Sequence, residues 1–326
     1  TGLKKPDAVN ATMRVPGFWG NEPLKQQLSQ LLREDRIPQA LVLEGEAGCG
    51  KRTLARLIAA ALCCRAAGER PCGHCAECRK SLGEGHPDII TVSGGDSPRS
   101  FKIDTVREMR ADVNIRPNEA ERKIYILENA HNMGEPAQNA LLKILEEPPE
   151  YAVFLLTCES AGQLLPTVLS RAAVLRVNTL DEETAIAAAL PLCPSAGEDE
   201  LRRAARAFGG NVGRMVEALS GGLLTRAGTV ANEMLASLPK KEETALLCAA
   251  APLLRDKDLC RAALGLLGSS LRDGIAGRGA LPGLNPGELV RLWQITRECT
   301  AAMDGYANQA LLVTVFCARM RRCIGR

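Results

Sequence analysis

The feature that most constrains the fold is a short apolar run, Ile124 to Leu127, that ends on the carboxylate of Glu128. Consecutive β-prone apolar residues are typical of a strand buried on both faces of a parallel sheet. In nucleotide-binding sheets, a carboxylate at this strand end holds magnesium, and the next residue is usually the glutamate that activates water. Here the next residue is Asn129, whose amide cannot accept a proton from water. Glu128 followed by Asn129 therefore predicts the strand of an ATPase that has lost its catalytic base. Alternatively, Glu128 merely ends a core strand.

A second motif, Gly45 to Lys51, has the spacing G-x-x-x-x-G-K of a phosphate-binding loop. It follows an apolar run expected to form a strand and precedes a helical segment, which is the context that this loop requires. Gly45, Gly48 and Gly50 let backbone N–H groups surround phosphate oxygens. Lys51 is expected to reach the outer phosphates.

The residue after this lysine departs from the motif. Arg52 stands where a serine or threonine would supply a hydroxyl to magnesium. Thr53 comes one residue late, which on a helix turns its hydroxyl away by roughly 100°. We therefore expect phosphate contacts to survive and Mg²⁺ to be absent. The motif leaves two alternatives open, a loop that binds ATP or ADP and a vestigial loop.

Residues 64–78 contain four cysteines with the spacing C-x7-C-x2-C-x2-C, which predicts a structural zinc site. Four thiolates close a tetrahedral coordination shell and leave no open position for catalysis. The expected ligands are Cys64, Cys72, Cys75 and Cys78. Cys63 is an alternative first ligand, and His74 is an alternative nitrogen donor. A redox or merely buried cluster is the competing interpretation.

The length of 326 residues suggests two or three domains, and the formal net charge of +3 neither demands nor excludes nucleic acid. The N-terminus lacks the apolar segment of a signal peptide, and no apolar run approaches the length of a membrane span. We therefore expect a cytoplasmic protein without membrane contact. Residues 1–14 are polar and read as an extension. Alanine and leucine dominate the second half, which predicts helices.

Several segments together resemble the AAA+ subunits of the bacterial DNA polymerase III clamp loader, most closely the delta-prime subunits. Besides the cysteine module, they are HPDI (86–89), FKIDTVREMRADVNIRP (101–117), YILENAH (125–131), QNALLKILEEPPE (138–150) and LLPTVLSR (164–171). The matching segments span about residues 18–176. The resemblance implies an α/β fold with an AAA+ P-loop parallel sheet at residues 15–178, a helical lid at 179–221 and an all-α collar at 222–326.

The resemblance also implies roles for individual residues. In that family the last motif supplies an arginine finger to the ATP site of a neighbouring gamma or tau subunit, which here implies Arg171 and the adjacent Ser170. The alternative for Arg171 is a surface arginine paired with an acidic helix. Arg214 occupies the place of a second sensor arginine, or stands at a helix start for structural reasons. Thr157 ends a further apolar run, where its hydroxyl would sense a phosphate or satisfy the backbone.

Arg52 and Asn129 both affect the same reaction, so the resemblance implies a subunit that does not hydrolyse ATP within the polymerase holoenzyme. Its implied partners are gamma/tau and delta subunits in a hetero-pentamer that loads a sliding clamp onto primed DNA. An ATP-hydrolysing gamma/tau-type subunit is the alternative, favoured by the intact glycines and Lys51. A zinc-dependent DNA-binding module is a further alternative.

Overall fold

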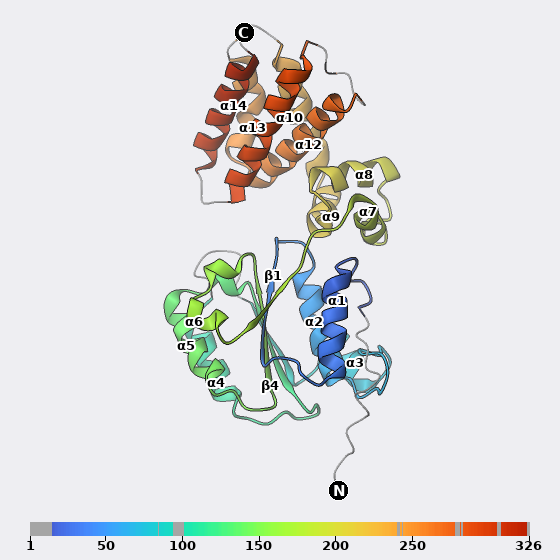
Figure 1. Cartoon of the computed structure of the whole chain (residues 1–326), viewed down its shortest axis with the longest axis vertical. Helices are drawn as coiled ribbons and strands as arrows, with labels where there is room; N and C mark the ends of the chain where they lie inside the picture. The colour runs from blue at the N-terminus through green and yellow to red at the C-terminus, as the bar shows by residue number, and fades with distance from the viewer. Residues whose placement is uncertain are drawn as a thin grey trace. The chain divides into compact units, whose positions relative to one another are not determined.

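The computed structural model describes residues 15–83, 85–93, 101–239, 242, 244–277, 281, 283–304 and 308–324. The extension expected at residues 1–14 lies outside them. The chain divides into two compact units, Thr1–Thr179 and Leu180–Arg326. Figure 1 draws both units.

The first unit is a parallel sheet covered by helices on both faces. Its five strands are β1 (Ala40–Glu44), β2 (Ile89–Ser93), β3 (Lys123–Glu128), β4 (Ala152–Cys158) and β5 (Ala173–Arg176), in the order β2-β3-β4-β1-β5. Its helices are α1 (Glu22–Arg33), α2 (Lys51–Cys63), α3 (Ala76–Leu82), α4 (Ile103–Asp112), α5 (Glu135–Leu145) and α6 (Pro166–Leu169). Figure 1 shows the sheet between α1, α2 and α3 on one side and α4, α5 and α6 on the other. The predicted α/β fold is therefore confirmed.

Strand β3 is buried along its whole length because its alternate side chains face two different helical layers. Ile124 and Ile126 belong to the apolar cluster formed with α1 and α2. Tyr125 and Leu127 belong to the cluster formed with α4 and α5. The ring of Tyr125 stacks on Phe154 of the neighbouring strand β4, with centroids 5.3 Å apart. The apolar run therefore forms the strand buried on both faces that the sequence predicts.

The segment before β3 is held by a single buried carboxylate, that of Asp88. Its oxygens accept hydrogen bonds from the backbone N–H groups of Asn118, Glu119 and Ala120 at 2.6–2.8 Å. Burial opposes ionisation, but these three donors outweigh it and lower the pKa of Asp88 below its ordinary value. His86 accepts a further bond from the backbone N–H of Asp88 through Nδ1, at 3.1 Å. The HPDI motif therefore has a structural explanation.

The described part of the second unit is helical. Its elements are α7 (Glu182–Ala189), α8 (Glu198–Ala207), α9 (Val212–Ser220), α10 (Leu223–Ser237), α11 (Ala245–Ala250), the short 3₁₀ helix η4 (Ala251–Leu254), α12 (Lys257–Ile275), α13 (Pro286–Asp304) and α14 (Gln309–Ile324). Helices α7, α8 and α9 enclose a small apolar cluster, and α10 to α14 enclose a larger one. The two clusters fall in the segments predicted as lid and collar, whose separation into two domains stays a prediction.

Helices α8 and α12 approach closely at a glycine of α12. A Cβ atom at Gly265 would lie 2.0 Å from the carbonyl oxygen of Ala207, the last residue of α8. Glycine is therefore required at this contact. No helix among the described ranges is long and apolar enough to cross a lipid bilayer.

Candidate functional site

The phosphate-loop motif lies between the end of β1 and the first residue of α2, Lys51. Gly48 and Gly50 have φ angles of 89° and 95°, in a region that favours glycine. Gly45 is needed for space, because a Cβ atom there would lie 2.3 Å from the carbonyl oxygen of Val177. The loop therefore has the order of strand, glycine turn and helix that the sequence predicts, and the helix N-terminus supplies free N–H groups.

Lys51 is 7% exposed and folds back against its own loop. Its Nζ donates to the carbonyl oxygens of Gly45 and Glu46, both at 2.7 Å. Burial lowers the pKa of Lys51 below its ordinary value. A phosphate group that entered the loop would replace these neutral acceptors with charged ones, which form stronger hydrogen bonds.

Arg52, the residue that replaces the magnesium-binding hydroxyl, pairs with the carboxylate expected to hold the metal. Its Nε lies 3.2 Å from Oε2 of Glu128. The Glu128 side chain is 8% exposed, and that of Arg52 is 51% exposed. The other oxygen of Glu128, Oε1, is buried without a hydrogen-bond partner among the described residues. A guanidinium fixed in the chain thus neutralises this carboxylate.

This donor set does not fit magnesium. The ion takes oxygen ligands in a nearly ideal octahedron, usually with one or two carboxylates among them. Here the carboxylate of Glu128 is paired with Arg52, and the position after Lys51 carries no hydroxyl. The pairing of the two departures could not be read from the sequence, because Arg52 and Glu128 lie 76 positions apart.

Asn129 and Thr157 connect the ends of β3 and β4. Asn129 adopts a left-handed conformation with a φ of 55°. Its backbone N–H donates to the hydroxyl oxygen of Thr157 at 3.0 Å, and Thr157 is 1% exposed. This geometry corresponds to the backbone role that the sequence leaves as one alternative for Thr157.

A cavity of about 510 Å³ opens at this end of the sheet. It is lined by Ala47, Gly48, Gly50, Lys51, Arg52, Thr53, Asn129, His131, Asn132, Thr157 and Glu159. The sequence motifs identified most of this lining but missed His131, Asn132 and Glu159. His131 lies two residues beyond Asn129, its Nδ1 is buried without a partner in the described chain, and burial lowers its pKa. The signal for His131 was its place in the segment that follows β3.

Arg171 lies after α6 and does not line this cavity. Its Nη1 donates to the backbone oxygen of Thr167 at 3.1 Å and to the hydroxyl of Ser170 at 3.3 Å. Its Nη2 lies 3.4 Å from Oε1 of Glu146, which follows α5. Both side chains are well exposed, and such a pair contributes at most about 1 kcal/mol. The guanidinium is therefore held weakly enough to exchange Glu146 for another anion.

Arg214 belongs to the second unit and lies in the first turn of α9. Its backbone N–H donates to Oδ1 of Asn211, the capping residue, at 3.3 Å. This is the helix-start position that the sequence gives as one alternative, and the sensor role stays a prediction.

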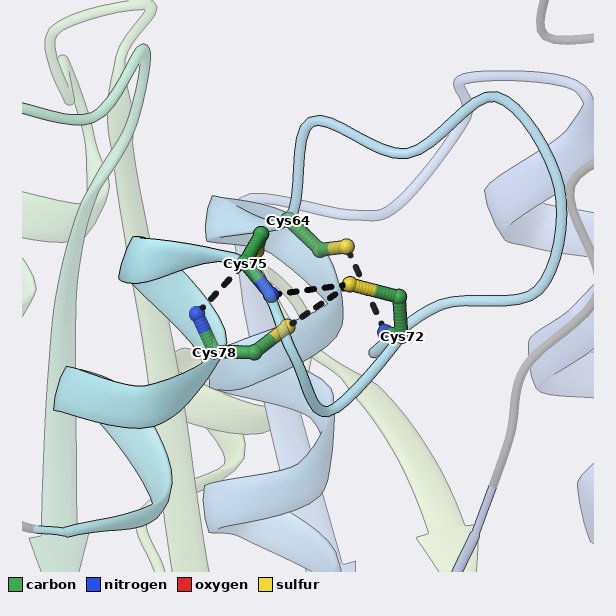
Figure 2. A group of neighbouring side chains, drawn as sticks. All are labelled: Cys64, Cys72, Cys75 and Cys78. Atoms are coloured by element: carbon green, nitrogen blue, oxygen red, sulfur yellow. Dashed lines mark hydrogen bonds between the residues drawn. The ribbon is translucent and has the colours of Figure 1, made fainter.

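The four predicted zinc ligands come together at the start of α3 (Figure 2). Their sulfur atoms all lie within 4.8 Å of one another, and those of Cys72 and Cys78 are 3.9 Å apart. Tetrahedral zinc with Zn–S distances of about 2.3 Å would place sulfurs about 3.8 Å apart. The cluster of Cys64, Cys72, Cys75 and Cys78 therefore fits this ion, for which it would supply four thiolates and no open position.

Backbone N–H groups orient these sulfurs. The N–H groups of Cys72, Cys75 and Cys78 donate to the sulfurs of Cys64, Cys72 and Cys75 at 3.4, 3.4 and 3.3 Å (Figure 2). Although burial opposes ionisation of Cys72, hydrogen bonds from the backbone of His74 and Cys75 lower the pKa of its thiol to about 6. The loop thus favours the thiolate of Cys72, whereas burial raises the pKa values of the Cys64 and Cys78 thiols.

The structure separates the cluster from the two alternative ligands. Cys63, the last residue of α2, lies outside the group, and burial together with the charge of Asp88 raises the pKa of its thiol to about 12. His74 directs its Nδ1 toward the backbone oxygen of Cys72, at 3.0 Å. Cys64 is therefore the first member of the cluster.

Comparison with known proteins gives the family. The model of a family described as "DNA polymerase III, delta subunit" matches residues 20–181. The DNA polymerase III subunit tau/gamma of Haemophilus influenzae is 34% identical over 165 residues, and subunit delta' of the same organism is 31% identical over 163 residues. This chain belongs to the DNA polymerase III clamp-loader family.

The family model covers residues 20–181, and the relatives do not decide the type of subunit. Each alignment covers 50% of this chain, but only 23% of the tau/gamma relative and 50% of the delta' relative. Relatives of both types match at similar identity. A solved gamma subunit-related protein from Thermotoga maritima is 19% identical, with a TM-score of 0.48, and the match covers 91% of this chain and 99% of that one.

Proposed function

We propose that this chain is a delta-prime subunit that does not hydrolyse ATP and that completes the ATP site of a neighbouring subunit with Arg171. The observation that carries the proposal is the ion pair between Arg52 and Glu128, which occupies the metal-binding carboxylate. Asn129 stands in place of the catalytic base at the end of the same strand. Two elements of one reaction are thus lost together, whereas Arg171 is kept on an exposed surface.

The proposed contribution of Arg171 is electrostatic. Charge develops on the transferred phosphoryl group, and a guanidinium delivered from a neighbouring subunit stabilises it by a factor of about 10³ to 10⁵ in rate. Among the described residues, Arg171 is held by exposed Glu146, by Ser170 and by a backbone oxygen, so it can reach an anion without leaving a buried charge unpaired.

The assembly that we propose is a hetero-pentamer with gamma/tau and delta subunits in the cytoplasm. Contact with the sliding clamp and primed DNA would occur through the complex. Zinc held by the four-cysteine cluster would stabilise the loop between α2 and α3, since a closed four-thiolate site contributes folding energy and no catalysis.

Substitution of Arg171 by alanine in a reconstituted loader tests this function. We expect DNA-dependent ATP hydrolysis to fall. The rate at the site that Arg171 completes would drop by about 10³-fold or more, and the other ATP sites would set the residual rate. Arg107→Ala is the matched control, since it removes an exposed arginine paired with Asp104 of α4. An unchanged rate in the Arg171 variant, with the complex intact, would remove the finger assignment.

An ATP-hydrolysing gamma/tau-type subunit is the second candidate. It is favoured by the complete set of glycines and Lys51, and by the tau/gamma relative at 34% identity. It requires that magnesium displace Arg52 from Glu128, which the delta-prime proposal does not.

A further inference from the structure

We propose that Glu146 masks the arginine finger. Its carboxylate holds the guanidinium of Arg171 in the unassembled chain and is exchanged for a nucleotide phosphate when a neighbouring subunit docks. The inference rests on the proposed function, since it concerns the same arginine. It adds Glu146 as the residue that sets how readily the guanidinium is delivered to the neighbouring site.

The positions of the two charges are set by the packing beneath them. Glu146 directly follows Leu145, the last residue of α5, and Arg171 comes two residues after Leu169, the last residue of α6. Leu145 and Val168 are buried in the same apolar cluster, in which α5 and α6 pack on each other. The core of the first unit therefore brings the carboxylate and the guanidinium together.

The two terminal nitrogens of Arg171 have different kinds of acceptor. Nη1 donates to the backbone oxygen of Thr167 at 3.1 Å and to the hydroxyl of Ser170 at 3.3 Å, and both acceptors are neutral. The Ser170 hydroxyl itself donates to the same oxygen of Thr167 at 3.0 Å. Among the described residues, the charged acceptor is Glu146, whose Oε1 lies 3.4 Å from Nη2. The end of α6 thus fixes one nitrogen, and Glu146 holds the other.

A phosphate would compete with Glu146 for Nη2. A guanidinium forms paired hydrogen bonds with phosphate through its Nη1–Nη2 edge or its Nε–Nη2 edge, and Nη2 belongs to both. Release of Glu146 costs little, because the side chains of Arg171 and Glu146 are 38% and 52% exposed and water solvates the freed carboxylate. Binding through the Nε–Nη2 edge keeps the contacts of Nη1 with α6. The side chain can therefore exchange one anion for another while its position on α6 is kept.

The experiment uses Glu146→Gln in the reconstituted loader and measures kcat/KM for DNA-dependent ATP hydrolysis at low ATP. Glutamine keeps the shape of the side chain and removes its charge, so the guanidinium no longer has to leave a carboxylate. We expect kcat/KM to rise about two- to fivefold, which corresponds to the contribution of an exposed ion pair. An unchanged or lower kcat/KM would overturn the proposal, because Glu146 would then not compete for Arg171.

Glu147→Gln is the matched control, since it removes the same charge from the next residue, which is also exposed. We expect the kcat/KM of this variant to equal that of the parent loader. A rise equal to that of Glu146→Gln would assign the effect to net charge on this surface and would overturn the proposal.

The double variant shows whether the effect of Glu146 acts through the arginine. In a loader that already carries Arg171→Ala, we expect Glu146→Gln to leave kcat/KM unchanged. A rise that persists without the arginine would contradict the masking role. If Arg171→Ala slows the loader and Glu146→Gln alone does not change it, this inference fails and the proposed function stands. If Arg171→Ala leaves the rate unchanged, both fail.

Discussion

Two side chains determine what the strand ends of this sheet can do. Arg52 fills the position of a hydroxyl and reaches across to Glu128, and Asn129 fills the position of a base. Neither change disturbs the surrounding fold, since β3 stays fully buried and the loop glycines keep their turns. The chemistry of the site therefore depends on residues that contribute little to the core.

A different residue, Asp88, determines the stability of the segment before β3. Asp88→Asn replaces one acceptor oxygen by a donor that faces backbone N–H groups, so we expect the free energy of unfolding at pH 7 to fall by about 3 kcal/mol. Asp104→Asn, on the exposed surface of α4, should cost less than about 1 kcal/mol. Urea denaturation of both variants measures the difference.

The effect of Asp88 should depend on pH. Its folded-state pKa lies below the ordinary value of 3.8, so its contribution is complete above pH values near 4 and is lost as the pH falls through the folded-state pKa. The stability gap between the parent chain and Asp88→Asn should therefore be constant from pH 7 to about pH 5 and narrow in stronger acid. A gap that grows on acidification would contradict this role.

At the scale of elements, the spacing predicted the four-cysteine cluster with Cys64 as its first member but left Cys63 open as the alternative. Cys63 and Cys64 are adjacent, and only the end of α2 decides between them: Cys63 completes the helix and faces inward, whereas Cys64 follows in an extended conformation and joins the cluster. Helix ends are set by tertiary packing as well as by sequence, which is why the spacing left both open.

Alanine variants of the two cysteines test this assignment. Cys64→Ala should lose tightly bound zinc, because three thiolates leave the tetrahedral shell incomplete. Cys63→Ala should keep about one zinc ion per chain and lose only the packing of a small buried side chain. Metal content of the purified chains measures both. Zinc retained by the Cys64 variant and lost by the Cys63 variant would reverse the assignment.

At the scale of the whole molecule, the sequence predicted the P-loop sheet, the helical second half and the family. Periodic apolar runs carry this information locally, so buried strands such as β3 were visible. Contacts between distant segments were not visible in the sequence. The pairing of Arg52 with Glu128 depends on the strand order, and the pairing of Arg171 with Glu146 depends on how α5 and α6 pack. His131 and Glu159 were missed because the ends of two different strands, β3 and β4, bring them to one cavity.

For the molecule as a whole, we propose that the chain keeps a cation for another subunit while its own strand ends no longer support hydrolysis. Steady-state ATP hydrolysis by the purified full-length chain in magnesium, compared with its Lys51→Ala variant, tests this claim most directly. We predict the same background rate for both proteins, because Arg52 occupies the metal-binding carboxylate of Glu128 and Asn129 replaces the base at the end of β3. Sustained turnover by the parent chain that Lys51→Ala abolishes would contradict it.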